Sequence, residues 1–68
     1  IIEVKSTSKD RFYFNDKDQL DELKKDSGYI PVYLVVRFLR KRWRAYELGE
    51  RIYDYEDGFS LEELFTRI

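Results

Sequence analysis

The sequence predicts a small α/β fold, with elements in the order β-α-β-β-α and helices packed on a mixed sheet. Three observations support this prediction. The chain opens with an apolar, strand-like segment at residues 1–7, and a longer apolar segment follows at 32–39. Two segments, 15–27 and 60–68, carry helix-capping residues and helical spacing of apolar residues. Because strand-like and helical segments alternate, we expect a sheet covered by helices.

The opening segment is expected to be a strand in which successive side chains point to opposite faces. Glu3 and Lys5 then share one face, about 6.6 Å apart along the strand. Ile2 and Val4 share the other face. An aromatic run at 12–14 is also compatible with a strand.

The first helix is expected to begin after Asn15, an N-cap residue followed by acids in the first turn, and to end near Ser27. Gly28 suits the position that stops a helix. The apolar stripe is thin, consisting of Leu20 and Leu23, so this helix should lie on one face of the sheet.

The segment 32–39 is apolar on both faces and is therefore expected to be the central strand. A tight connection at 40–42 leads to a strand at 43–48, which should pair antiparallel with it. A short edge strand is expected at 52–55.

The last segment begins with a capping box, in which Ser60 and Glu63 stand three residues apart. Apolar residues at helical spacing follow, so a short amphipathic helix is expected. The phenylalanines are interpreted as packing residues: Phe12, Phe14, Phe38 and Phe65.

The composition limits the chemistry. The 68 residues form one domain, 1–68, and include no cysteine and no histidine. Disulfides and cysteine-ligated zinc are therefore excluded, and so is the commonest general base. Any metal would be a hard ion that prefers oxygen ligands. No apolar run approaches the ~18 residues of a membrane span, so we expect a soluble, cytoplasmic (intracellular) protein.

An acid and a lysine on one face of an apolar strand suit metal-assisted hydrolysis of a phosphodiester. The Glu3 carboxylate and the backbone carbonyl of Val4 could ligate Mg²⁺. Lys5 could orient the attacking water and balance charge on the phosphorane. The alternative is structural, because the same pair also suits a solvated strand face or a cross-strand ion pair.

Charge is segregated along the chain although the net charge is only -1. A basic ridge, interleaved with Trp43, could grip DNA phosphates; it consists of Arg37, Arg40, Lys41, Arg42 and Arg44. Lys9 and Arg11 are further candidates for DNA contact. The alternative is a solvated hairpin balanced by the acidic segment 50–63. The apolar surface of so short a chain also favours self-association.

The run Ile2-Glu3-Val4-Lys5, followed by Thr7, Lys9, Asp10 and Tyr13, resembles the archaeal Holliday junction resolvases. Later stretches are similar to the same family: Ile30-Pro31-Val32, Phe38-Leu39, Trp43-Arg44 and Gly58 to Glu62. The resemblance implies a restriction-endonuclease-like nuclease fold and Mg²⁺-dependent cleavage of four-way or branched DNA by a homodimer, with Mn²⁺ as a substitute metal. It also implies that Glu3 is the metal ligand and Lys5 the catalytic lysine.

Two acidic residues of the family pattern, a glutamate on an N-terminal helix and an aspartate on the preceding strand, would lie upstream of Ile1. The chain is therefore interpreted as the C-terminal part of the nuclease domain, lacking the N-terminal helix and first strands. Two other interpretations stay open. The chain could be a non-catalytic, truncated nuclease-like module that binds branched DNA or only dimerises, or a nuclease of the same fold that acts on single strands or ends.

Overall fold

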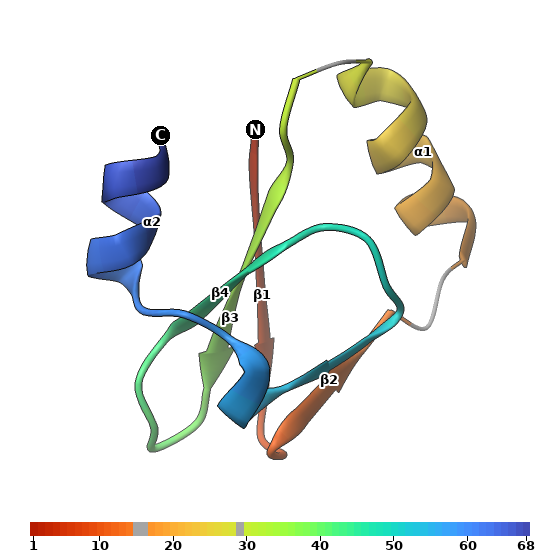
Figure 1. The fold of residues 1–68 in the computed structure, drawn as a ribbon. Coiled ribbons are helices and arrows are strands. Elements are labelled where there is room, and N and C mark those ends of the chain that lie inside the picture. Colours follow the sequence, from red (N-terminus) through yellow and green to blue (C-terminus); the bar gives the residue numbers. More distant parts are fainter. Residues whose placement is uncertain (15–16, 29) are drawn as a thin grey trace.

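A computed structural model describes residues 1–14, 17–28 and 30–68 of the chain. The expected N-cap Asn15 lies outside these residues. Figure 1 shows the fold. In chain order, its elements are β1 (Ile2–Thr7), β2 (Arg11–Tyr13), α1 (Lys17–Ser27), β3 (Tyr33–Phe38), β4 (Arg44–Glu47), β5 (Ile52–Asp54), a 3-10 turn (Tyr55–Asp57) and α2 (Leu61–Arg67). The α/β class and the expected order of the main elements are confirmed.

The main sheet has the strand order β1-β3-β4, so the apolar strand β3 is central, as predicted. β1 runs parallel to β3, with Val4 opposite Val35. β4 runs antiparallel to β3, with Ala45 opposite Val35. The predicted edge strand at 52–55 does not extend this sheet. As β5, it pairs antiparallel with β2 in a small sheet of its own.

The main core lies on the face of the sheet that carries the even-numbered residues of β3. Leu34, Val36 and Phe38 are almost completely buried there. Leu20 of α1 packs in the same cluster, together with Phe14, Tyr46 and Tyr53. This burial of a thin apolar stripe explains why α1 is stable on the sheet, and it confirms the expected position of the helix.

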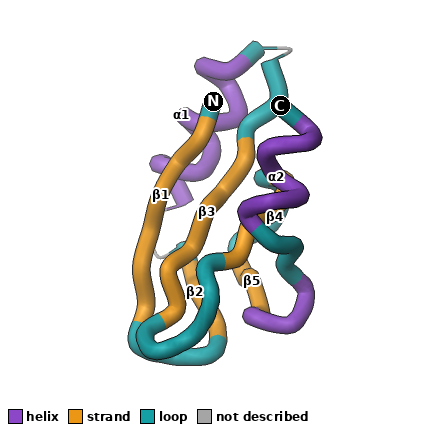
Figure 2. The backbone as a smooth tube through the Cα atoms, turned by 90° about the vertical axis from the view of Figure 1, so that its left-hand side faces the viewer, coloured by secondary structure: helices purple, strands orange, loops and turns teal. Residues whose placement is uncertain are grey.

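A smaller cluster covers the opposite face, where Leu64 of α2 packs against Val35 and Ala45. The two helices therefore lie on opposite sides of the main sheet (Figure 1). Figure 2 views the molecule from the α2 side and shows α2 near β4, with β1 at the far margin of the sheet. Ile2 and Val4 of β1, on this same face, are 43% and 56% exposed.

Local signals account for the helix ends. Gly28 adopts a positive φ of 60° and follows α1, as expected of a C-terminal glycine. At the start of α2, the Ser60 hydroxyl accepts a hydrogen bond from the Glu63 N–H at 3.1 Å. In a full capping box, the Glu63 carboxylate would accept from the Ser60 N–H. Here the carboxylate forms an ion pair with Arg67, at 3.3 Å. Neither helix in the described segments has the length and apolar character needed to traverse a bilayer.

The packing role of the phenylalanines is confirmed for Phe12, Phe14 and Phe38 and is wrong for Phe65. Phe14 and Phe38 are buried, and Phe12 packs against the main cluster. Phe65 is 67% exposed, because Leu64 and Leu61 are the residues that α2 turns toward the sheet.

Gly58 is predicted to be intolerant of a side chain. A Cβ atom there would lie 2.8 Å from both the Arg44 Cβ and the Tyr46 Cζ. We expect Gly58→Ala to lower the free energy of unfolding by about 1–3 kcal/mol, the usual cost of overpacking. Urea denaturation measures the effect. Gly49→Ala is the matched control, because nothing lies within 4 Å of its added Cβ; equal losses in both variants would contradict the packing argument.

Candidate functional site

Glu3 and Lys5 lie side by side on β1, as the strand alternation predicts. The Lys5 Nζ is 3.4 Å from a carboxylate oxygen of Glu3. Their side chains are 28% and 27% exposed, so both are sheltered yet reachable from solvent. In the register, Glu3 lies opposite Leu34 and Lys5 opposite Val36, which places the pair on the face that carries the main core.

Helix α1 contributes a third member of this group. The Lys5 ammonium donates a long hydrogen bond of 3.5 Å to the side-chain oxygen of Gln19. Lys5 is thus held from two elements, its own strand and the helix above it. Gln19 was not among the residues predicted from the sequence. The Leu20 and Leu23 stripe indicates which helical face meets the sheet, but not which strand residue lies beside position 19.

Among the described strands, β1 pairs only with β3, so its other backbone edge has no strand partner there. Within the sheet, the Tyr33 N–H donates to the Ile1 carbonyl at 2.9 Å, and the Leu39 N–H donates to the Thr7 carbonyl at 3.0 Å. Since hydrogen-bonding directions alternate along a strand, the odd-numbered residues of β1 face β3. The N–H and carbonyl of Val4 therefore face the outer edge.

This arrangement fits a hard divalent cation in part. The Glu3 carboxylate and the outward carbonyl of Val4 are oxygen donors of the kind that Mg²⁺ takes, and Mg²⁺ usually keeps several waters. No group of three or more carboxylates able to hold a metal exists among residues 1–14, 17–28 and 30–68. Any further ligand at Glu3 would therefore be water, substrate or a group from another segment.

Three of the seven basic residues predicted to bind DNA already have partners within the molecule. Arg11 forms a close ion pair with Asp54, which raises the pKa of the Arg11 guanidinium. Lys41 lies 2.6 Å from Asp10, and this hydrogen bond raises the pKa of Lys41.

Arg44, the third of these residues, donates to the carbonyls of Tyr55 and Gly58. Its guanidinium thereby holds the turn that leads into α2. Arg44 is half-buried and therefore still borders solvent. Its guanidinium N–H groups, however, already donate to carbonyls within the molecule.

The other four basic candidates are exposed: Lys9, Arg37, Arg40 and Arg42. Within the part of the chain that the structure describes, their side chains form no ion pair or hydrogen bond. Arg37 is the cross-strand neighbour of Ser6, so it points to the face opposite Glu3 and Lys5. In the predicted basic ridge, Lys41 and Arg44 therefore have partners within the molecule, whereas Arg37, Arg40 and Arg42 face solvent.

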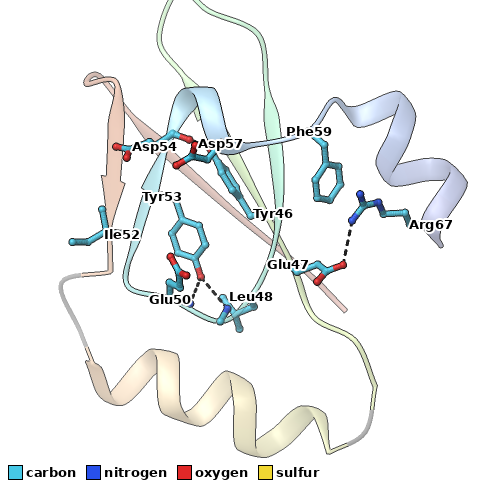
Figure 3. Close-up of a pocket in the computed structure, with 11 residues that line it drawn as sticks. Tyr46, Glu47, Leu48, Glu50, Ile52, Tyr53, Asp54, Asp57, Phe59 and Arg67 are labelled. Atoms are coloured by element: carbon cyan, nitrogen blue, oxygen red, sulfur yellow. Dashed lines mark hydrogen bonds and ion pairs between the residues drawn. The ribbon is translucent and has the colours of Figure 1, made fainter.

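A depression of about 540 Å³ lies elsewhere, between β4, β5 and α2 (Figure 3). Its eleven lining residues include four acids and one base, and its polar groups support the fold. The Tyr53 hydroxyl accepts from the N–H groups of Gly49 and Glu50, and Glu47 pairs with Arg67 at 3.2 Å. It includes neither Glu3 nor Lys5, so it is not the predicted site.

Tyr46, which lines this depression, gives a pH prediction. Its hydroxyl donates to the Asp54 carbonyl at 2.5 Å, and burial raises the pKa of Tyr46 to about 12. An exposed tyrosine has a pKa of about 10. The folded state therefore holds this proton more tightly, and its contribution to stability is complete below pH 10 and declines as the pH rises toward 12.

Thermal unfolding measured between pH 9 and pH 12 tests this prediction. The melting temperature of the original chain should fall more steeply over this range than that of Tyr46→Phe, which has no hydroxyl to ionise at this position. Parallel curves for the two proteins would contradict a raised pKa at Tyr46.

No protein-family model matches the sequence. The structure matches that of Hjc from Archaeoglobus fulgidus, described as a Holliday junction resolvase from an archaeal hyperthermophile, with a TM-score of 0.74. The two chains are 21% identical, and the match covers 93% of this chain. The chain has part of the Hjc fold. It spans 61% of the Hjc chain, so the resemblance to the archaeal resolvases is confirmed for the fold over that portion.

Proposed function

We propose that this chain carries the catalytic edge of a Mg²⁺-dependent DNA endonuclease that resolves four-way (Holliday) junctions. The observation that carries the proposal is the Glu3–Lys5 pair, with 3.4 Å between ammonium and carboxylate, beside the outward carbonyl of Val4. The fold shared with a Holliday junction resolvase supports the choice of substrate.

Each residue has a defined role in this proposal. Glu3 and the Val4 carbonyl hold the metal ion, which supplies charge neutralisation and activation of water when it is bound. Lys5, positioned by Glu3 and Gln19, donates hydrogen bonds to the attacking water and to the charge that develops on the phosphorane. A side chain held in place before reaction costs little reorganisation, which is why attachment to both β1 and α1 favours catalysis.

The exposed cations favour DNA as the substrate. Four of them have no partner in the described residues and can release condensed counterions when they meet phosphates; they are Lys9, Arg37, Arg40 and Arg42. Arg11, Lys41 and Arg44 stay candidates, each of which would have to leave or share an internal partner.

Exposed apolar residues support a homodimer as the assembled form. Ile1, Ile2 and Val4 lie along β1, the strand with an unpaired edge, and are 43% to 56% exposed. Burying this apolar side-chain surface against a second copy would remove apolar area from water.

The alternative function is a non-catalytic module that binds branched DNA or only dimerises. One observation favours it: the described residues contain no group of three or more carboxylates that could hold a metal at Glu3 or elsewhere. A module that binds branched DNA differs from the nuclease in cleavage, and a module that only dimerises differs in DNA binding as well.

A labelled four-way junction and a duplex of matched sequence, each incubated with the chain in Mg²⁺ and in EDTA, test the proposal. Symmetric nicks near the branch point that require Mg²⁺ are the expected result. Junction binding without cleavage would support the non-catalytic module instead. Absence of both binding and cleavage would contradict the nuclease and the DNA-binding module, and would leave only the module that dimerises.

A further inference from the structure

A second polar site lies on the face of the sheet opposite Glu3 and Lys5. It is a shallow depression of about 300 Å³ lined by Ser6, Thr7, Ser8, Arg37 and Leu39. β1 and β3 are parallel, and both end here, because Thr7 and Phe38 are the last pair in their register. The Leu39 N–H donates to the Thr7 carbonyl at 3.0 Å. The depression therefore lies over the ends of two hydrogen-bonded strands.

Several hydrogen-bond donors line or border this depression. Ser6 and Arg37 are direct cross-strand neighbours, so both side chains rise from the same face. Ser6 is an even-numbered residue of β1, and its backbone N–H faces the unpaired edge. The Thr7 hydroxyl accepts from the Lys9 N–H at 3.2 Å, which turns the chain and places Ser8 at the rim.

These donors have no partner in the described part of the chain. Ser6, Ser8 and Arg37 are exposed, and none of their side chains forms a hydrogen bond or ion pair there. By contrast, the nearby Lys41 is neutralised by Asp10 and Arg11 by Asp54. Arg37 is thus a positive charge that the fold positions but does not neutralise.

The chemistry of the depression selects an anion. No acidic residue lines it, and Leu39, which is 51% exposed, forms an apolar wall. Two hydroxyls, a backbone N–H and a planar guanidinium match the acceptor oxygens of a phosphate group. Arg40 follows Leu39 in the chain and adds a further exposed cation at this end of the sheet.

We propose that this depression is a phosphate subsite that takes one backbone phosphate of a nucleic acid, separate from the phosphate that is cleaved. The inference rests on the proposed function for its nucleic-acid ligand. Ser6 lies three residues beyond Glu3, about 10 Å along the strand. B-DNA rises about 3.4 Å per nucleotide along each strand, so a backbone that crosses the open edge of β1 reaches both sites within a few nucleotides.

The first experiment measures binding of a fluorescent four-way junction in EDTA, where cleavage does not occur. Arg37→Gln should weaken binding about tenfold, the loss of one charge-assisted contact, and lower the slope of log K against log salt by about 1. Ser6→Ala should also weaken binding of the junction. The matched control is Lys25→Gln, which removes an exposed cation at the end of α1, on the other side of the sheet.

The second experiment separates a nucleic-acid phosphate from free phosphate. The amide spectrum of the ¹⁵N-labelled chain is recorded with inorganic phosphate and, separately, with a short oligonucleotide. The expected result is a shift of the Ser6 and Ser8 signals with the oligonucleotide that is lost in Arg37→Gln.

Each outcome is decisive. Junction binding by the original chain with equal affinities for Arg37→Gln and Lys25→Gln would overturn the subsite and leave the proposed function intact. If the amide signals of Ser6 and Ser8 shift with inorganic phosphate but not with the oligonucleotide, the depression binds free phosphate. That result would overturn its proposed role in binding nucleic acid. Absence of any DNA binding by the original chain would overturn the proposed function, and the subsite as a nucleic-acid contact with it.

Discussion

Replacing Glu3 by Gln is expected to reduce Mg²⁺-dependent cleavage of a four-way junction on the order of 100-fold or more, the loss typical of one preorganised electrostatic group. Gln keeps the shape of the side chain but carries no charge to hold a divalent cation. It also removes the ionic partner of Lys5, 3.4 Å away. The side chain is partly exposed, so the fold should tolerate the change. Initial rates of nicking with the labelled junction measure this effect.

The control for this variant is Glu22→Gln, which removes an exposed carboxylate from α1. It should cleave at the rate of the original chain, and both variants should bind the junction equally well in EDTA. A Glu3→Gln protein that still cleaves within a few-fold of the original rate would show that Glu3 holds no essential metal.

Replacing Phe38 by Ala is expected to lower the free energy of unfolding by about 3–5 kcal/mol, the usual cost of truncating a buried phenylalanine. Phe38 is 1% exposed, and its ring packs edge-on against Tyr55 with 5.2 Å between centroids. Because small domains bury a modest core and are marginally stable, this loss should leave the chain largely unfolded at 25 °C. Circular dichroism in increasing urea measures the change.

Phe65→Ala is the matched control, since it removes the same side chain from an exposed position of α2. Alanine has the higher helix propensity, so the variant should unfold at nearly the same urea concentration as the original chain. A large loss of stability in Phe65→Ala would mean that this face of α2 is covered in solution, for example by a second copy of the chain.

Features that depend on near neighbours in the sequence could be predicted. Strand alternation was sufficient to place Glu3 and Lys5 on one face of β1, because the period of two holds wherever a strand forms. The same applies to the helix ends at Ser60 and Gly28, where a cap and a positive φ are properties of single residues. β3 was recognised as central since apolar residues on both faces need cover on both sides.

Features that depend on pairing across the chain could not be predicted. Arg11 meets Asp54 although 43 positions separate them, and Lys41 meets Asp10 across 31. Both were predicted as candidates for DNA contact, because charge patterning does not reveal which acid the topology brings to each cation. For the same reason, the pairing of β5 with β2 was missed.

The central claim is that the outer edge of β1 binds a divalent cation through Glu3 and the Val4 carbonyl, next to Lys5. The most direct test follows the amide spectrum of the ¹⁵N-labelled chain as Mn²⁺ is added, since a paramagnetic ion broadens the signals of nearby nuclei. We predict that the signals of residues 3–5 broaden first, and that Glu3→Gln removes this effect. Broadening confined to the acidic segment 50–63, with the signals of residues 3–5 unchanged, would contradict the claim.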